Sequence, residues 1–202
     1  FPYTTLFRSG DVKYVDVNHD GVINASDKVD LGNGLPKYTF GFNFSLAWKG
    51  FDLSANFTGA AGFQIAQSYR DPSSSQANYS RRILKRWTGE GTSNEIPRVT
   101  YGDVGNWLFS DLYLQDGDYI RLQNLTMGYD FKKLISWKGL SKMRLYFQVQ
   151  NLFTLTKYDG MDPEIGSYNG TDGNSSDSWV SGVDMGYYPH PRTFIVGVNV
   201  AF

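Results

Sequence analysis

The sequence predicts an all-β fold with about five antiparallel strands, and three observations support this. Aromatic residues make up 16% of the 202 residues and there are 22 glycines, a composition typical of strands and turns. Several segments alternate between apolar and polar residues, which is the period of a strand. Apolar runs of about 18 residues or more are absent, so the sequence predicts no transmembrane helix.

The clearest alternating run spans residues 38–48. One face of it carries large apolar side chains and the other carries small or mildly polar ones, as a hydrated lumen wall would; the apolar set is Phe40, Phe42, Phe44, Leu46 and Trp48. A second run, 51–62, follows the short turn Lys49-Gly50 and predicts a hairpin.

Three further strands are predicted over 118–131, 142–154 and 192–202. The connections between the five strands alternate between short and long. Bacterial outer-membrane barrels have this arrangement, with short periplasmic turns and long extracellular loops. We therefore predict the C-terminal part of a transmembrane outer-membrane β-barrel, with long extracellular loops at 63–117 and 156–190.

A soluble β-sandwich is the alternative, because its strands alternate in the same way. The predicted strands are longer than the five or six residues usual in soluble sheets. Trp and Tyr also lie toward the strand ends, as in the interfacial girdles of membrane barrels. The last strand ends on Phe202, an aromatic residue that we expect to direct assembly into the membrane.

An acidic segment, 10–36, contains a pattern typical of calcium-binding loops. Oxygen donors stand at its positions 1, 3 and 5, glycine at 6, a backbone carbonyl at 7 and a carboxylate at 12. These candidate ligands are Asp16, Asn18, Asp20, the Val22 carbonyl and Asp27. Asp27 replaces the usual Glu, and an Asx-rich turn without metal is the alternative.

The sequence does not predict an enzyme. It contains no cysteine, and neither His19 nor His190 has a neighbouring nucleophile pattern. Asp162 and Glu164 are spaced like a glycosidase pair, but their turn-rich loop favours solvated acids. A net charge of −1 gives no support for nucleic-acid binding.

The long loops hold the remaining candidates for function. Tyr79, Ile83 and Trp87 have helical spacing, which predicts a helix over 76–87 with a basic face. That face is interpreted as solvated, with an anionic ligand or lipopolysaccharide as the alternative. Four loop aromatics are weak candidates for stacking on a sugar substrate: Trp107, Trp179, Tyr187 and Tyr188.

Several segments, in order, resemble the C-terminal part of the SusC-like (RagA-like) TonB-linked outer-membrane proteins of Bacteroidetes. They are 10–27, 33–42, 86–88, 96–98, 118–129, 150–154, 160–164 and 188–194. The resemblance implies a 22-stranded barrel with a plug in its lumen, located in the outer membrane. It also implies uptake of glycans or peptides, energised through TonB, with a SusD-like surface lipoprotein as partner. Outer-membrane lipids and the barrel-assembly machinery would be further partners.

The chain departs from that family at its beginning, where it lacks a signal peptide, the plug and the TonB box. Residues 1–9 resemble a translated sequencing adapter and are interpreted as non-native, leaving 10–202 as the C-terminal portion of the barrel. Two other functions stay open at this point. One is a TonB-dependent siderophore or cobalamin receptor, and the other is a soluble, calcium-stabilised carbohydrate-binding module.

Overall fold

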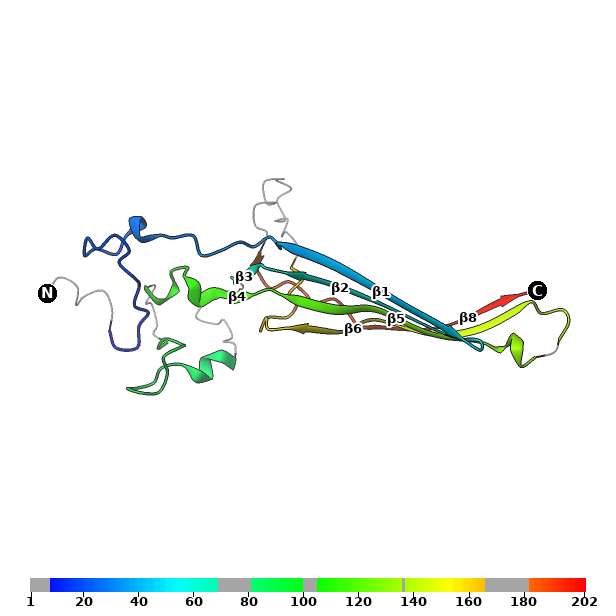
Figure 1. Cartoon of the computed structure of the whole chain (residues 1–202). Coiled ribbons are helices and arrows are strands. Elements are labelled where there is room, and N and C mark those ends of the chain that lie inside the picture. Colours follow the sequence, from blue (N-terminus) through cyan, green and yellow to red (C-terminus); the bar gives the residue numbers. More distant parts are fainter. Residues whose placement is uncertain (1–7, 69–80, 100–104, 136, 166–181) are drawn as a thin grey trace, which may run out of the picture. The chain divides into compact units, whose positions relative to one another are not determined.

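The computed structural model describes residues 8–68, 81–99, 105–135, 137–165 and 182–202 (Figure 1). The chain divides into two compact units. One combines Phe1–Leu31 with Ser68–Tyr113, and the other combines Gly32–Gln67 with Leu114–Phe202. Within the described ranges, every helix is too short or too polar to cross a membrane.

The second unit is built on one five-stranded sheet. Its strands are β1 (Tyr38–Trp48), β2 (Phe51–Ala61), β5 (Tyr119–Asp130), β6 (Lys142–Thr156) and β8 (Thr193–Ala201). They lie side by side in chain order, and each neighbouring pair is antiparallel (Figure 1). The predicted strands are confirmed, with ends that differ by at most two residues.

The strand registers gather the large apolar side chains on one face of this sheet. Directly paired residues share a face, and Phe42 pairs with Phe57 while Phe147 pairs with Val196. The face stays exposed: Phe42 is 59% and Val196 is 70% accessible. A soluble sandwich would bury this face against a second sheet, so the exposure favours the barrel over that alternative.

The opposite face is polar and carries an ion pair across three strands. Asp52 of β2 pairs with Gly128 of β5, and Arg144 of β6 lies diagonally from Gly128, two residues before its direct partner Tyr146. Arg144 reaches over Gly128, and its Nε and Nη2 lie 2.8 and 2.5 Å from the Asp52 carboxylate oxygens. A Cβ at position 128 would come within 2.5 Å of the Arg144 Nε, so Arg144 could keep this position only beside a glycine.

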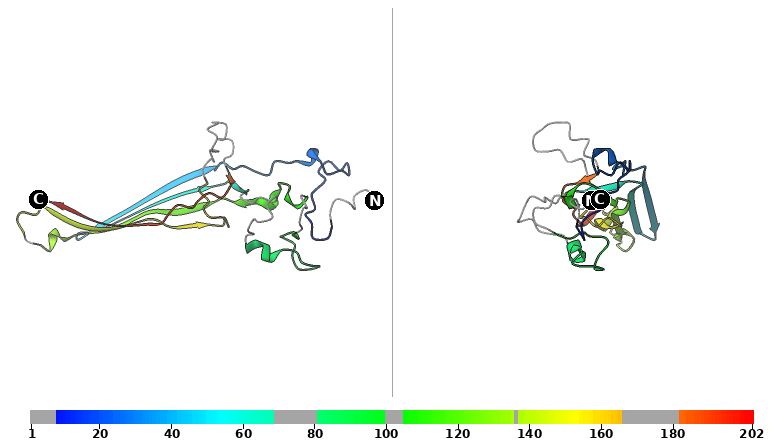
Figure 2. Two further views of the ribbon diagram at one scale, coloured as in Figure 1. Left: turned by 180° about the vertical axis from the view of Figure 1, so that it is seen from behind. Right: turned by 90° about the vertical axis from the view of Figure 1, so that its left-hand side faces the viewer.

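Extra residues accumulate from strand to strand near the middle of the sheet. The step of two residues from Ala55 to Phe57 in β2 is matched by a step of three residues in β5, between Leu125 and Leu122. In β6 the matching step, from Val149 to Phe153, is four residues. Gln123 is the inserted residue of β5, and it keeps Leu122 on the apolar face and Arg121 on the polar face. Such bulges bend a sheet and re-aim side chains, and the strands are visibly curved in the left view of Figure 2.

A second, three-stranded sheet lies in the same unit, in the order β4 (Leu114–Asp116), β3 (Gln64–Gln67) and β7 (Val183–Asp184). Beside it is a small core of Ala60, Phe63, Ile65 and Tyr158. Asp184 is 1% exposed and accepts hydrogen bonds from the Tyr158 hydroxyl and from the N–H groups of residues 186 and 187. These strands are too short to show a period, so the sequence did not predict them.

The first unit contains loops and short 3-10 helices. The described part of the predicted helix 76–87 is not an α-helix: Arg81–Lys85 form a 3-10 helix, and 76–80 lie outside the described residues. The Trp87 N–H donates to the Ile96 carbonyl at 2.9 Å. Arg98 Nε lies 2.5 Å from Asp11 Oδ1, and this hydrogen bond lowers the pKa of Asp11 to about 2.

Candidate functional site

A buried arginine stands on the polar face of the sheet, near the end from which the long loops leave. Arg121 of β5 is 3% exposed. Its guanidinium donates to Thr154 Oγ1 on β6 at 3.0 Å, to Glu164 Oε2 at 2.8 Å and to Asp162 Oδ1. Burying a guanidinium requires such partners, because an unpaired buried charge is strongly unfavourable.

Asp162 connects this arginine to the far end of the same loop. It is 5% exposed, and its Oδ2 accepts the N–H of His190 and faces His190 Nδ1, both at 3.0 Å. We call Arg121, Thr154, Asp162, Glu164 and His190 the Arg121 cluster. It joins the beginning and the end of the connection between β6 and β8 to the wall of the sheet.

The electrostatics of the Arg121 cluster favour a charged Asp162. Burial alone raises the pKa of this carboxyl. The backbone N–H groups of His190 and Glu164, the His190 ring and the charge of Arg121 act in the opposite direction, and the net pKa lies below its ordinary value. The expectation of solvated acids was therefore wrong for Asp162, whereas the Glu164 side chain is 48% exposed.

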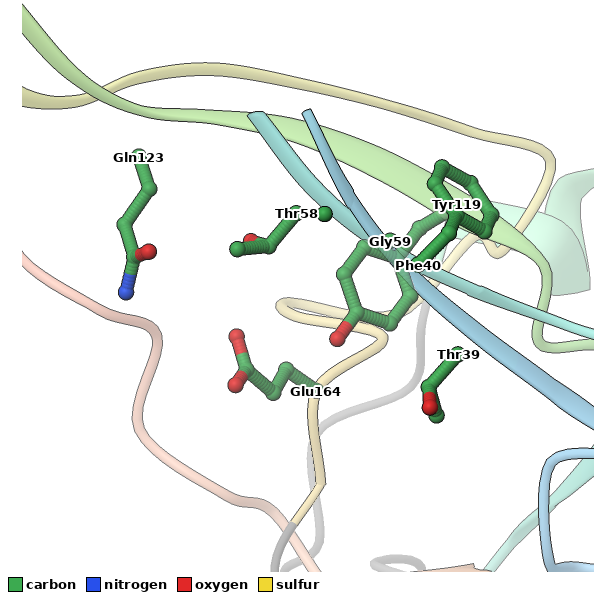
Figure 3. Close-up of a pocket in the computed structure, with 8 residues that line it drawn as sticks. Thr39, Phe40, Thr58, Gly59, Tyr119, Gln123 and Glu164 are labelled. Atoms are coloured by element: carbon green, nitrogen blue, oxygen red, sulfur yellow. The ribbon is translucent and has the colours of Figure 1, made fainter. Parts of the chain in front are cut away.

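A cavity of about 370 Å³, lined by both polar and apolar groups, adjoins the Arg121 cluster. Figure 3 shows Gln123, Thr58 and Glu164 around one open space, with Thr39 and Tyr119 beside it. The bulge in β5 supplies Gln123, so the sheet irregularity contributes directly to the lining. Carboxylate, amide and hydroxyl groups of this kind can hydrogen-bond a polar ligand, such as a sugar or a peptide.

The four predicted stacking aromatics fall in different places. Tyr187 is brought beside the Arg121 cluster, with its ring centroid 6.2 Å from that of His190. Tyr188 is 82% exposed. Trp107 ends a 3-10 helix, Gly105–Trp107, of the other unit, and Trp179 lies outside the described residues.

The predicted calcium loop is a tight turn held by its own side chains. Asp16 Oδ2 accepts the N–H of Gly21 at 2.7 Å, and Gly21 has a φ of +83°, which glycine adopts without strain. Asp27 accepts the N–H groups of Val17 and Asn24 at 2.9 and 2.7 Å. These hydrogen bonds, that from Asn24 foremost, lower the pKa of the Asp27 carboxyl.

The donor set of this loop fits a hard cation in one respect. Asp16 Oδ1 is buried and has no hydrogen-bond partner in the part of the chain that the structure describes. Asn18 Oδ1 and Asp20 Oδ1 are engaged by the N–H groups of Asp20 and Val22. Groups of three acidic, His or Cys side chains close enough to hold a metal do not occur among the described residues. The calcium site stays a prediction.

Phe202 follows β8 and lies at the turn end of the sheet. It is 83% exposed, and its ring meets that of Trp137 edge-on at 6.2 Å. Its role in assembly stays a prediction.

The sequence analysis did not predict the Arg121 cluster, although a signal was present. An arginine on the polar face of a predicted strand favours a nearby acid, and Asp162-Pro163-Glu164, in the loop after the next strand, provides two.

The fold and its two unlike faces define a class of protein: the sheet is a segment of an outer-membrane β-barrel. No family model matches the chain. The solved structure of the RagAB peptide transporter aligns with 90% of this chain and 19% of its own, with a TM-score of 0.69 and 23% identity. This likeness supports the fold.

Sequence relatives narrow the class to a family. The chain is 34% identical to TonB-dependent receptor P3 of Formosa agariphila over its whole length and 20% of that receptor. It is 28% identical to TonB-dependent receptor SusC of Bacteroides thetaiotaomicron, over 94% of the chain and 17% of SusC. The chain belongs to the SusC/RagA-like TonB-dependent transporters, and it spans about one fifth of the length of these relatives.

Proposed function

We propose that this chain forms part of the barrel wall of a TonB-dependent importer in the bacterial outer membrane, and that it has no catalytic activity. The observation that carries the proposal is the contrast between the two faces of one sheet. Lipid would contact the exposed apolar face, and the hydrated lumen would contact the polar face with the Arg121 cluster and its cavity.

The substrate class in this proposal is a glycan or a peptide. The cavity offers hydrogen-bonding side chains of both kinds, donors and acceptors, which suits hydroxyl-rich or amide-rich molecules. A SusD-like surface lipoprotein would capture the substrate above the long loops. Energy for the uptake would come from TonB.

Growth of the native bacterium on defined substrates tests the proposal. Deletion of the complete transporter gene should abolish growth on one glycan or peptide mixture and leave growth on its monomers intact. Rescue should require both the transporter gene and a neighbouring SusD-like gene. Loss of siderophore or cobalamin uptake, with glycan and peptide use unchanged, would instead favour the other class of TonB-dependent receptor.

We also propose that the acidic loop binds Ca²⁺, because Asp16 has a buried oxygen with no partner in the described structure. Calorimetric titration of the complete transporter with Ca²⁺ should give a binding heat that Asp20→Ala removes. Asp30→Ala, outside the twelve-residue loop, is the matched control and should leave the heat unchanged. Absence of any calcium-dependent heat in the unmodified protein would rule the site out.

A further inference from the structure

The turn end of the main sheet forms one continuous surface. The turn Lys49-Gly50 joins β1 to β2, and residues 131–141 join β5 to β6. The Asp130 N–H donates to the Gly50 carbonyl at 2.7 Å, which brings the two turns together. The Ser141 N–H donates to the Ala201 carbonyl at 2.8 Å, which adds the end of β8.

Large apolar side chains project from this surface. Trp48 is 65% exposed, Trp137 60% and Leu134 68%. Trp137 also packs edge-on against Phe202. Tryptophan is the side chain that most often sits at the boundary between hydrocarbon and headgroups, because its ring is apolar and its N–H is polar.

The same surface is strongly cationic in a chain whose net charge is −1. Residues 49–52 and 130–144 contain six cationic side chains and two acidic ones. Both acids are engaged: Asp52 pairs with Arg144, and Asp130 accepts the Lys132 N–H at 3.0 Å. Four further lysines carry the excess positive charge: Lys49, Lys138 and Lys142 are exposed, and Lys132 is partly exposed.

Two of these lysines contact the exposed tryptophans Trp48 and Trp137. Lys49 Nζ is 4.9 Å from the centroid of the Trp48 ring, and Lys132 Nζ donates to the Trp137 carbonyl at 2.7 Å. Each ammonium group therefore contacts a tryptophan residue, Lys49 through the Trp48 ring and Lys132 through the Trp137 backbone. A ligand that fits must carry negative charge next to an apolar body.

We propose that this turn end binds the phosphate of an anionic phospholipid in the membrane leaflet nearest the turns. The lysine ammonium groups would hold the phosphate, and Leu134, Trp137 and the apolar face would contact the acyl chains. The inference rests on the proposed membrane location. It goes beyond it in assigning a headgroup class and the side chains that recognise it.

The test uses the complete transporter reconstituted in bilayer discs. Bound phosphatidylglycerol and phosphatidylcholine are counted by native mass spectrometry. The double variant Lys132→Gln and Lys138→Gln should lose the preference for phosphatidylglycerol, by about fivefold for each lysine removed. The matched control is Lys37→Gln and Lys157→Gln, at two exposed positions beyond the other end of the strands, and it should keep the preference.

Each contrary outcome has a distinct meaning. Equal lipid preference in the two double variants, or no preference in the unmodified protein, would overturn the phospholipid site. Competition by soluble inorganic phosphate as strong as that by phosphatidylglycerol would assign the site to free phosphate and overturn the lipid assignment. Failure of the protein to insert in bilayers, measured by heat-modifiable electrophoretic mobility, would contradict the proposed function itself.

Discussion

At the scale of single residues, Arg121 and Asp162 carry the most consequence. They are 3% and 5% exposed and come from a strand and a loop 41 positions apart. A buried ion pair gains its stability only when both partners and their remaining hydrogen bonds are present. Thr154, Glu164 and His190 supply those remaining bonds here.

Replacing Arg121 by Met should destabilise the loop strongly, by about 3–5 kcal/mol, because Asp162 would be left buried and unpaired. Glu164→Gln is the matched control and should cost about 1 kcal/mol or less, since Glu164 is half exposed. Urea unfolding of the complete transporter in lipid vesicles measures both. Equal effects of the two substitutions would show that Arg121 does not depend on its buried partner.

The Arg121 cluster should also depend on pH. The pKa of Asp162 is lowered in the folded protein, so its contribution to stability is fully present above the ordinary value of 3.8. The contribution is lost as the pH falls below that value and through the folded pKa. Limited proteolysis of the loop should accelerate in this acid range. In Asp162→Asn the cleavage rate should be higher at neutral pH and should change little on acidification.

The sequence predicts the faces of the strands at this scale but not the Arg121 cluster. Alternation assigned Phe42 and Leu53 to the apolar face because a strand repeats every two residues. The pairing of Arg121 with Asp162 and His190 depends on how a loop folds back over the sheet, and no periodic signal records that. Burial of Asp162 was consequently missed.

At the scale of elements, the five long strands were predictable and the short ones were not. Eleven alternating residues specify β1, whereas β7 has two residues and pairs in parallel with β3. The bulge at Gln123 could not be predicted from the sequence either, because one inserted residue only interrupts an alternating pattern. It nevertheless places Leu122 on the apolar face and Gln123 in the cavity lining.

Deleting Gln123 should impair assembly of the barrel. Without the inserted residue, either Arg121 moves to the apolar face or the register of β5 slips against β2. The substitution Gln123→Ala keeps the residue count and should assemble normally. The folded fraction in the outer membrane, read from heat-modifiable mobility, measures both variants. Normal levels of the deletion variant would show that the bulge is dispensable.

At the scale of the whole molecule, the main sheet has one apolar and one polar face and two edge strands, β1 and β8. In hydrocarbon an open edge leaves backbone N–H and C=O groups without partners, which costs several kcal/mol for each group. The proposed barrel would supply those partners from strands on either side. Expressed alone, the 202-residue chain should therefore aggregate through its edges.

A charge on the apolar face should reduce the amount of protein in the outer membrane. Val198 lies on that face opposite Leu145, and Val198→Asp should be unfavourable, though by less than the about 2–4 kcal/mol that Lys or Arg costs at the midplane. The neighbouring substitution Asn199→Asp, on the polar face, is the matched control. Reduced levels of the first variant alone are expected, and equal levels of both would contradict the lipid-facing assignment.

The position of the small core has a consequence for backbone amide hydrogen exchange. Ala60, Phe63, Ile65 and Tyr158 are buried at the loop end of the sheet, whereas the turn end has exposed side chains. In detergent or in a thinned bilayer, water would reach the turn-end amides first, and those strands would open from that end. Protection against deuterium should therefore fall along β2 from Ala60 toward Phe51, as a gradient within one strand.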